Sequence, residues 1–121
     1  MPERRMGAEG ADAPNPRTLL EKLATSPDLR PFRRLLGPLE AHDREHNGDL
    51  LRTLRVYLAC GGNVSRTADR LYLHRNSIPY RLERIRSVVG LDLNDDRVRL
   101  ALQLGILAME KGEDRDEAEH P

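Results

Sequence analysis

The sequence predicts an all-α protein, a small helical bundle that contains a helix-turn-helix and carries a disordered tail at each end. Aromatic residues make up only 3% of the 121 residues, so Leu, Val, Ile and Ala must fill the core, which suits helices better than a β-sandwich. Apolar residues recur at helical spacing, without strand alternation. Gly, Pro and Asn separate the apolar segments and mark the ends of the helices.

The length fits one small domain flanked by flexible ends. Residues 1–16 are rich in Gly, Ala and Pro and lack apolar periodicity, and residues 111–121 are mostly acidic. We expect both segments to be disordered tails. Between them the sequence predicts linker helices over 17–47 and the main domain over 48–110.

The linker region is expected to hold two short helices. Leu19, Leu20 and Leu23 predict the first, which ends before "TSPD", residues 25–28. Asp28 is expected to cap the second, which carries Leu29 and Phe32 and stops at Gly37-Pro38. The following stretch "EAHDREHNGD", residues 40–49, is interpreted as a polar connector.

The main domain begins with a strong amphipathic helix that Asp49 is expected to cap and that Gly61-Gly62 ends. Asn63 is expected to open the next helix, and a tight turn follows over 72–74. An arginine-rich helix comes next, with Gly90 placed to end it. Its inward residues are expected to be Ile78, Leu82, Ile85 and Val89.

The last helix follows the capping sequence "LDLNDD", and its stretch "LALQLGILAM", residues 100–109, is apolar almost all round. Such a helix can be the central core of the domain, and part of it can also pack on a second subunit. The sequence leaves both interpretations open.

Pro79 lies inside the arginine-rich segment and fixes where that helix can begin. A helix starting at Arg75 would place Pro79 fifth, at a cost of about 3 kcal/mol. With Asn76 or Ser77 as the cap, the missing N–H of Pro79 falls in the first turn, where it has no helical partner anyway. We therefore predict that the regular helix begins near Ser77 and that His74–Asn76 form an extended turn.

Residues 63–89 have the spacing of a helix-turn-helix. Ala68 is small enough for two helices to cross closely, and the turn comes four residues later. Leu73 is expected to fill the space between the helices. Tyr72 stands in the turn, where a positive φ would strain a residue other than glycine.

The charge pattern of this segment favours binding to duplex DNA. Residues 61–90 hold six arginines and two acidic residues, a local net charge of +4 in a chain of formal net charge +0. An arginine-rich helix can also be an ordinary solvated face, but the helix-turn-helix spacing favours groove binding and phosphate contact. The candidate groove-contacting residues are His74, Arg75, Asn76 and Tyr80, with Ser77 beside them. The candidate phosphate-contacting residues are Arg66, Arg81 and Arg84.

Four motifs, "LLRTLRVYL", "GGNVSRTA", "HRNSIPYRLERI" and "GLDLNDDRVRLALQL", together resemble the C-terminal DNA-binding domain of PucR/CdaR-type bacterial transcription regulators, a Fis-like helix-turn-helix. Residues 26–43 also resemble the linker helices of that family, so the resemblance covers about residues 26–109. It implies a DNA-binding domain over 48–110 that binds promoters sequence-specifically, usually as a dimer and often as an activator. A cytoplasmic location, on the nucleoid when bound to DNA, is expected.

The expected partners are double-stranded DNA and a second copy of the chain. A homodimer would present two recognition helices to half-sites about one DNA turn, ~34 Å, apart. The alternative is a truncated regulator that acts as a protein-interaction module, dimerising with and modulating a larger sensory member of the family.

Other function classes find little support in the sequence. One cysteine, Cys60, allows no internal disulfide, and neither a signal peptide nor a membrane span is expected. His42 and His46 have the i, i+4 spacing of zinc ligands but lack an evident third ligand. No catalytic arrangement or phosphate-binding loop is present, so the sequence predicts no enzyme, no metal and no cofactor.

Overall fold

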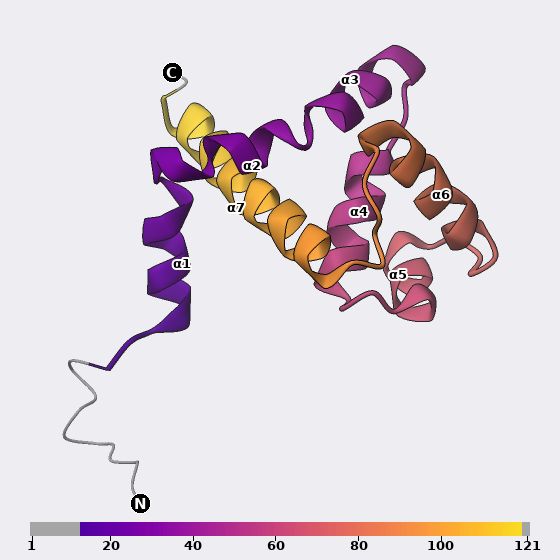
Figure 1. The fold of residues 1–121 in the computed structure, drawn as a ribbon, viewed down its shortest axis with the longest axis horizontal. Coiled ribbons are helices and arrows are strands. Elements are labelled where there is room, and N and C mark those ends of the chain that lie inside the picture. The colour runs from indigo at the N-terminus through magenta and orange to yellow at the C-terminus, as the bar shows by residue number, and fades with distance from the viewer. Residues whose placement is uncertain (1–12, 120–121) are drawn as a thin grey trace, which may run out of the picture.

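A computed structural model describes residues 13–119, with side chains described up to residue 112. All regular elements in this range are helical, which confirms the predicted all-α class (Figure 1). In chain order they are α1 (Pro16–Ala24), the 3-10 helix η2 (Pro27–Leu29), α2 (Arg30–Arg34), α3 (Gly37–His46), α4 (Leu50–Ala59), α5 (Val64–Leu71), α6 (Ser77–Val89) and α7 (Asp96–Glu119). None of the described helices is long and apolar enough to cross a membrane.

The two segments predicted as tails fall partly outside the described residues, which exclude 1–12 and 120–121. At the N-terminal end, the side chain of Asn15 accepts the backbone N–H groups of Arg17 and Thr18 and so caps α1. At the C-terminal end, the backbone of α7 stays helical through residues 111–119, where the sequence predicted the start of an acidic tail.

The prediction of a polar connector over 40–49 was wrong, because most of this stretch belongs to α3. Gly37-Pro38, expected only to end a helix, begins this one, since proline fits the first helical turn without losing a hydrogen bond. Leu39 is fully buried and anchors α3 to the core. Asn47 ends the helix in the left-handed conformation, with a φ of 53°.

The second linker helix is also shorter than expected and begins differently. The predicted cap was Asp28, but the hydroxyl of Ser26 accepts the backbone N–H of Asp28 and starts the 3-10 helix η2. Regular α-helix follows only over Arg30–Arg34. A proline at each start, Pro27 and Pro31, fits these first turns because its φ is already helical.

The start of α4 is capped by Asp43, not by Asp49 as predicted. The two carboxylate oxygens of Asp43 accept the backbone N–H groups of Leu50 at 3.0 Å and Leu51 at 2.9 Å. Gly48 makes this approach possible, since a Cβ there would lie 2.9 Å from the Asp43 Oδ1. The cap ties the middle of α3 to the first turn of α4.

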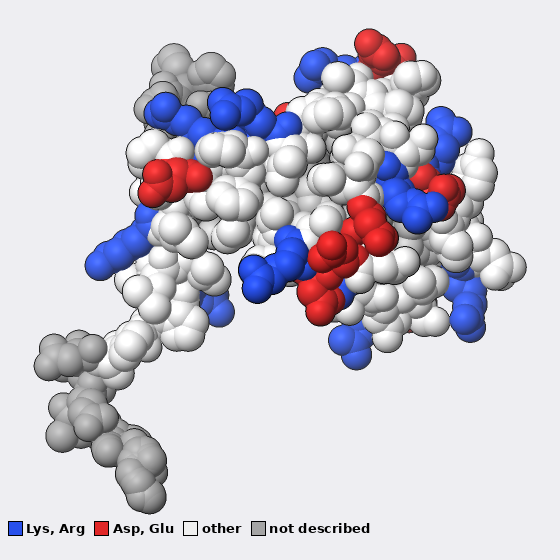
Figure 2. All heavy atoms as spheres, viewed as in Figure 1, with Lys and Arg blue, Asp and Glu red and all other residues white. Residues whose placement is uncertain are grey.

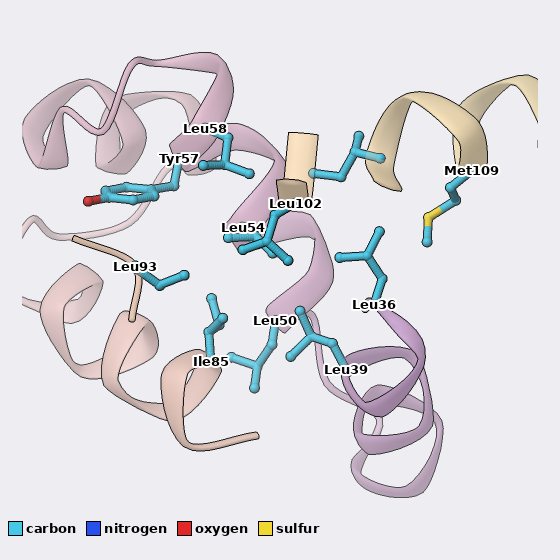
Figure 3. Close-up of a cluster of buried hydrophobic side chains, with 11 residues drawn as sticks. Leu36, Leu39, Leu50, Leu54, Tyr57, Leu58, Ile85, Leu93, Leu102 and Met109 are labelled. Atoms are coloured by element: carbon cyan, nitrogen blue, oxygen red, sulfur yellow. The ribbon is translucent and has the colours of Figure 1, made fainter. Parts of the chain in front are cut away.

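One apolar core joins α3, α4, α6 and α7 (Figure 3). Each large aliphatic side chain buried in it contributes about 1.5–3 kcal/mol relative to an exposed one. Helix α7 contributes Leu102, Ile106 and Met109 to this core. The central-core interpretation of the last helix is therefore confirmed for the face that carries these three residues. The whole cluster comprises Leu36, Leu39, Leu50, Leu54, Tyr57, Leu58, Ile85, Leu93, Leu102, Ile106 and Met109.

The upstream helices are held against the domain by a close crossing of α2 over α7 (Figure 1). Gly105 of α7 is buried at this crossing, and a Cβ there would lie 2.5 Å from the carbonyl oxygen of Phe32. The backbone of α2 therefore occupies the place of a side chain. Only glycine permits this contact without movement of one helix.

Candidate nucleic-acid interface

The first helix of the helix-turn-helix is α5, and its N-terminal cap is as predicted. The side-chain oxygen of Asn63 accepts the backbone N–H of Arg66 at 2.8 Å. Ala68 is buried with Leu71 and Ile78 at the contact between α5 and α6, and Leu73 packs against this cluster. The expected small residue at the crossing and the expected apolar plug are both confirmed.

The turn between α5 and α6 uses a positive φ at Tyr72. Its dihedral angles are φ 58° and ψ 42°, and the backbone N–H of Leu73 reaches the carbonyl of Ala68 at 2.9 Å. This left-handed conformation costs a residue with a Cβ about 1–2 kcal/mol. The Tyr72 side chain is 91% exposed, so no packing within the described residues offsets the strain.

Replacing Tyr72 by glycine is expected to raise the free energy of unfolding by about 0.5 kcal/mol, because relief of the strain exceeds the extra freedom that glycine gains in the unfolded chain. Chemical denaturation measures the change. Tyr80→Gly is the control: this tyrosine is also exposed but lies within α6, so glycine there should destabilise. A loss of stability in both variants would contradict the strain argument.

The second helix, α6, begins at Ser77 as predicted, which makes Pro79 its third residue. The preceding segment differs from the expected extended turn, because Asn76 has helical angles of φ −66° and ψ −19°. The N–H groups of Ser77 and Ile78 reach the carbonyls of His74 and Arg75, so these residues form a tight turn. Asn76 precedes the helix, but its side chain makes no capping bond.

The structure brings most of the predicted site residues to the turn and the first half of α6. His74, Arg75, Asn76, Tyr80 and Arg84 are exposed, and Tyr80 is 68% accessible. The backbone N–H of Asn76 donates to Nδ1 of His74 at 3.1 Å, while the amide side chain of Asn76 makes no capping bond to α6. Ser77 is partly buried beside them, and Arg66 is exposed on α5.

Arg81 differs from the other arginines of this set. Its guanidinium pairs with the carboxylate of Asp49 at 2.5 Å and donates to the hydroxyl of Thr53 at 3.3 Å. Its side chain is only 26% exposed. Arg81 thus fastens α6 to the start of α4, and its charge is balanced in the protein without DNA.

The two flanks of α6 differ in charge. On one flank, Arg86 donates to both carboxylate oxygens of Glu83, and this hydrogen bond and the negative charge of Glu83 raise the pKa of Arg86. Glu83, Arg86 and Asp92 line a shallow pocket there, beside Pro79. The basic side chains over the α5–α6 part of the molecule stand in separate groups, and acidic side chains lie beside some of them (Figure 2).

The other flank of α6 faces α3 across a groove of about 560 Å³. Sequence reasoning missed the α3 side of this groove because it treated the segment as a connector. The i, i+4 spacing of His42 and His46 was the available signal, since it places both rings on one face of a helix. The groove is lined by His42, His46, Gly48, Asp49, Leu50, Ser77, Tyr80, Arg81 and Arg84.

Comparison with known protein families decides the family of this domain. Residues 50–108 match the PucR C-terminal helix-turn-helix domain. Residues 50–108 are a PucR-type helix-turn-helix domain. The resemblance noted in the sequence is thereby confirmed, and the matched range of the PucR-type domain runs from the start of α4 to the middle of α7.

The chain is also similar to curated bacterial proteins. The chain is 36% identical over 76 residues to the proline-responsive transcriptional activator PutR of Bacillus subtilis, covering 63% of this chain and 18% of PutR. It is 36% identical over 87 residues to the purine catabolism regulatory protein of the same organism, covering 72% of this chain and 16% of that protein. It is 39% identical over 90 residues to the carbohydrate diacid regulator of Escherichia coli, covering 71% of this chain and 23% of the regulator. The matched part thus spans less than a quarter of each relative, and no solved structure matches the chain.

Proposed function

We propose that this chain binds duplex DNA sequence-specifically through its helix-turn-helix and regulates transcription. The observation that carries the proposal is an exposed surface on a PucR-type domain, formed by Arg75 and Asn76 in the turn before α6 and by Tyr80 in the first half of α6. An α-helix with its side chains is about 10–12 Å wide and fits a major groove about 12 Å wide. Such a role belongs in the cytoplasm, on the nucleoid when DNA is bound.

Each exposed residue has a role that its chemistry suits. The amide of Asn76 can bond both N6 and N7 of an adenine, and Arg75 can bond O6 and N7 of a guanine. His74, Ser77 and Tyr80 complete the groove-facing set, while Arg66 and Arg84 contact phosphates. Arg81 contributes by holding α6 in place through Asp49 and reaches a phosphate only when this ion pair opens.

Selection of bound sequences from a random pool of duplex DNA tests the proposal. The expected outcome is one enriched motif, which Asn76→Ala should relax at a single base position. Asn94→Ala is the control, because Asn94 is exposed outside the helix-turn-helix and should leave the motif unchanged. Recovery of no motif by the unaltered chain would contradict sequence-specific binding.

We further propose a homodimer that forms through the apolar surface of α1 and α7. Leu19, Leu20 and Leu100 are each about half exposed, although large aliphatic residues are normally buried. A groove of about 380 Å³ lies on this surface and includes Leu104 and Leu107 of α7. A contiguous exposed apolar patch of this kind is typical of an interface between subunits.

Leu100→Glu is expected to convert the dimer into a monomer, because it would place a charge in the apolar interface. Sedimentation velocity measures the mass. Arg97→Glu is the control, since Arg97 is exposed on α7 but does not line the groove. An unaltered chain that sediments as a monomer at all concentrations would rule out the homodimer.

The same apolar surface supports the alternative function, an interaction module that pairs with a larger member of the family. Two observations distinguish the alternatives. Co-purification of a larger PucR-type protein, together with no retention on DNA at low salt, would favour the interaction module. Retention of the purified chain alone on a selected duplex would favour direct regulation.

A further inference from the structure

The groove between α3 and α6 borders the face of α6 that is proposed to enter DNA. Ser77, Tyr80, Arg81 and Arg84 line it at spacings of three and four residues along α6. On a helix this spacing is one stripe that runs along two turns. Tyr80 and Arg84 therefore belong both to the DNA-facing surface and to one wall of the groove.

A recognition helix in the major groove has a sugar-phosphate backbone along each flank, because its width nearly fills that groove. The flank beside Pro79 carries the acidic residues Glu83 and Asp92. The flank beside α3 carries Arg81 and Arg84, and the one carboxylate that lines it, Asp49, is paired with Arg81. Arg84 has no ion pair within the described residues, so a phosphate is favoured on the α3 flank.

The opposite wall of the groove is a fixed part of α3. The rings of His42 and His46 stack with centroids 4.2 Å apart and planes 20° from parallel. Nδ1 of His46 lies 2.9 Å from the carbonyl oxygen of His42, at donor distance. The Asp43 cap holds the same turn of α3 against α4. The position of His46 is therefore set before any ligand arrives.

We infer that this groove seats a phosphate of the DNA backbone, held between Arg84 of α6 and His46 of α3. The inference rests on the proposed DNA binding and extends the interface to a helix upstream of the PucR-type domain. With both ring nitrogens of His46 protonated, Nδ1 can donate to the His42 carbonyl, 2.9 Å away, while Nε2 donates to the phosphate.

The charged and titratable groups facing this site determine its net charge. They are His42 and His46 from α3, Asp49 before α4, and Tyr80, Arg81 and Arg84 from α6. Asp49 remains paired with Arg81, so protonation of His46 adds positive charge opposite the phosphate.

The test uses the full chain and the duplex obtained by selection, with binding followed by fluorescence anisotropy. His46→Gln is expected to weaken binding about tenfold. Arg44→Gln is the matched control, because Arg44 is exposed on the same helix but does not line the groove. His46 is exposed at the last position of α3, so the variant should fold, which a thermal melt verifies.

A second measurement locates the phosphate. Single phosphates of the duplex are replaced in turn by neutral methylphosphonates. One flanking position should weaken binding of the unaltered chain but not weaken that of His46→Gln further, because the two changes remove the same contact. Equal effects of His46→Gln and Arg44→Gln, or additive effects at every phosphate, would overturn the inference.

Two further outcomes separate this inference from related possibilities. Failure of the unaltered chain to bind any duplex would defeat the proposed function itself, whereas normal binding without a His46 effect would defeat only the phosphate seat. Inorganic phosphate serves as a separate probe of the His46 ring signals by NMR. A shift with inorganic phosphate but none with the duplex would assign the groove to a small anion and overturn the inference.

Discussion

Replacing Arg75 and Arg84 together by alanine is expected to weaken binding to duplex DNA about 100-fold, since each removes a charge-assisted interaction. The slope of log affinity against log salt concentration should fall by about 0.9, because Arg84 no longer neutralises a phosphate whereas Arg75 is assigned to a guanine. Both side chains are exposed, that of Arg75 in the turn before α6 and that of Arg84 within α6. Neither is engaged in an ion pair within the described residues, so their charges are available to DNA.

The matched control removes two arginines elsewhere. Arg30 and Arg34 are exposed at the two ends of α2, and their double replacement by alanine changes the net charge by the same amount. This control should alter affinity and salt slope little. Similar losses in the two double variants would mean that the overall charge, not the helix-turn-helix, drives binding.

Gly105→Ala is expected to lower the free energy of unfolding by about 2 kcal/mol, as measured by chemical denaturation. Alanine is the better helix former by about 1 kcal/mol, so a gain would be expected from helix propensity alone. The added Cβ would instead lie 2.5 Å from the carbonyl oxygen of Phe32, and overpacking of this kind typically costs about 1–3 kcal/mol or more. The clash should outweigh the propensity.

Gly112 offers the control on the same helix. A Cβ there would meet only the end of the Arg33 side chain, at 3.6 Å. Gly112→Ala should therefore raise the free energy of unfolding by up to about 1 kcal/mol. If Gly105→Ala were as stabilising as Gly112→Ala, the close crossing of α2 and α7 would not exist in solution.

The features predicted correctly from sequence are those that depend on neighbouring residues. Asn63 caps α5 through its own first turn, and Gly90 ends α6 with a φ of 72°. Pro79 located the start of α6 because a proline excludes most positions within a helix. The small Ala68 marked the helix crossing, since few other positions require so small a side chain.

The features that sequence reasoning missed depend on contacts between distant residues. Asp49 looked like a helix cap, but Arg81, 32 positions later, takes its carboxylate. The charge pattern alone cannot show that Arg81 is thereby engaged. His46 was interpreted as part of a connector, because the burial of Leu39 that stabilises α3 arises only when the helix meets the core.

The Asp43 cap also determines where the chain can be cut. The family match begins at residue 50, but the acceptor for the first two N–H groups of α4 lies seven and eight positions upstream. A fragment starting near residue 48 would expose these donors and remove Leu39 from the core. A fragment that keeps this cap and the buried Leu36 and Leu39 must therefore include all of α3, a full helix before the boundary that family similarity marks.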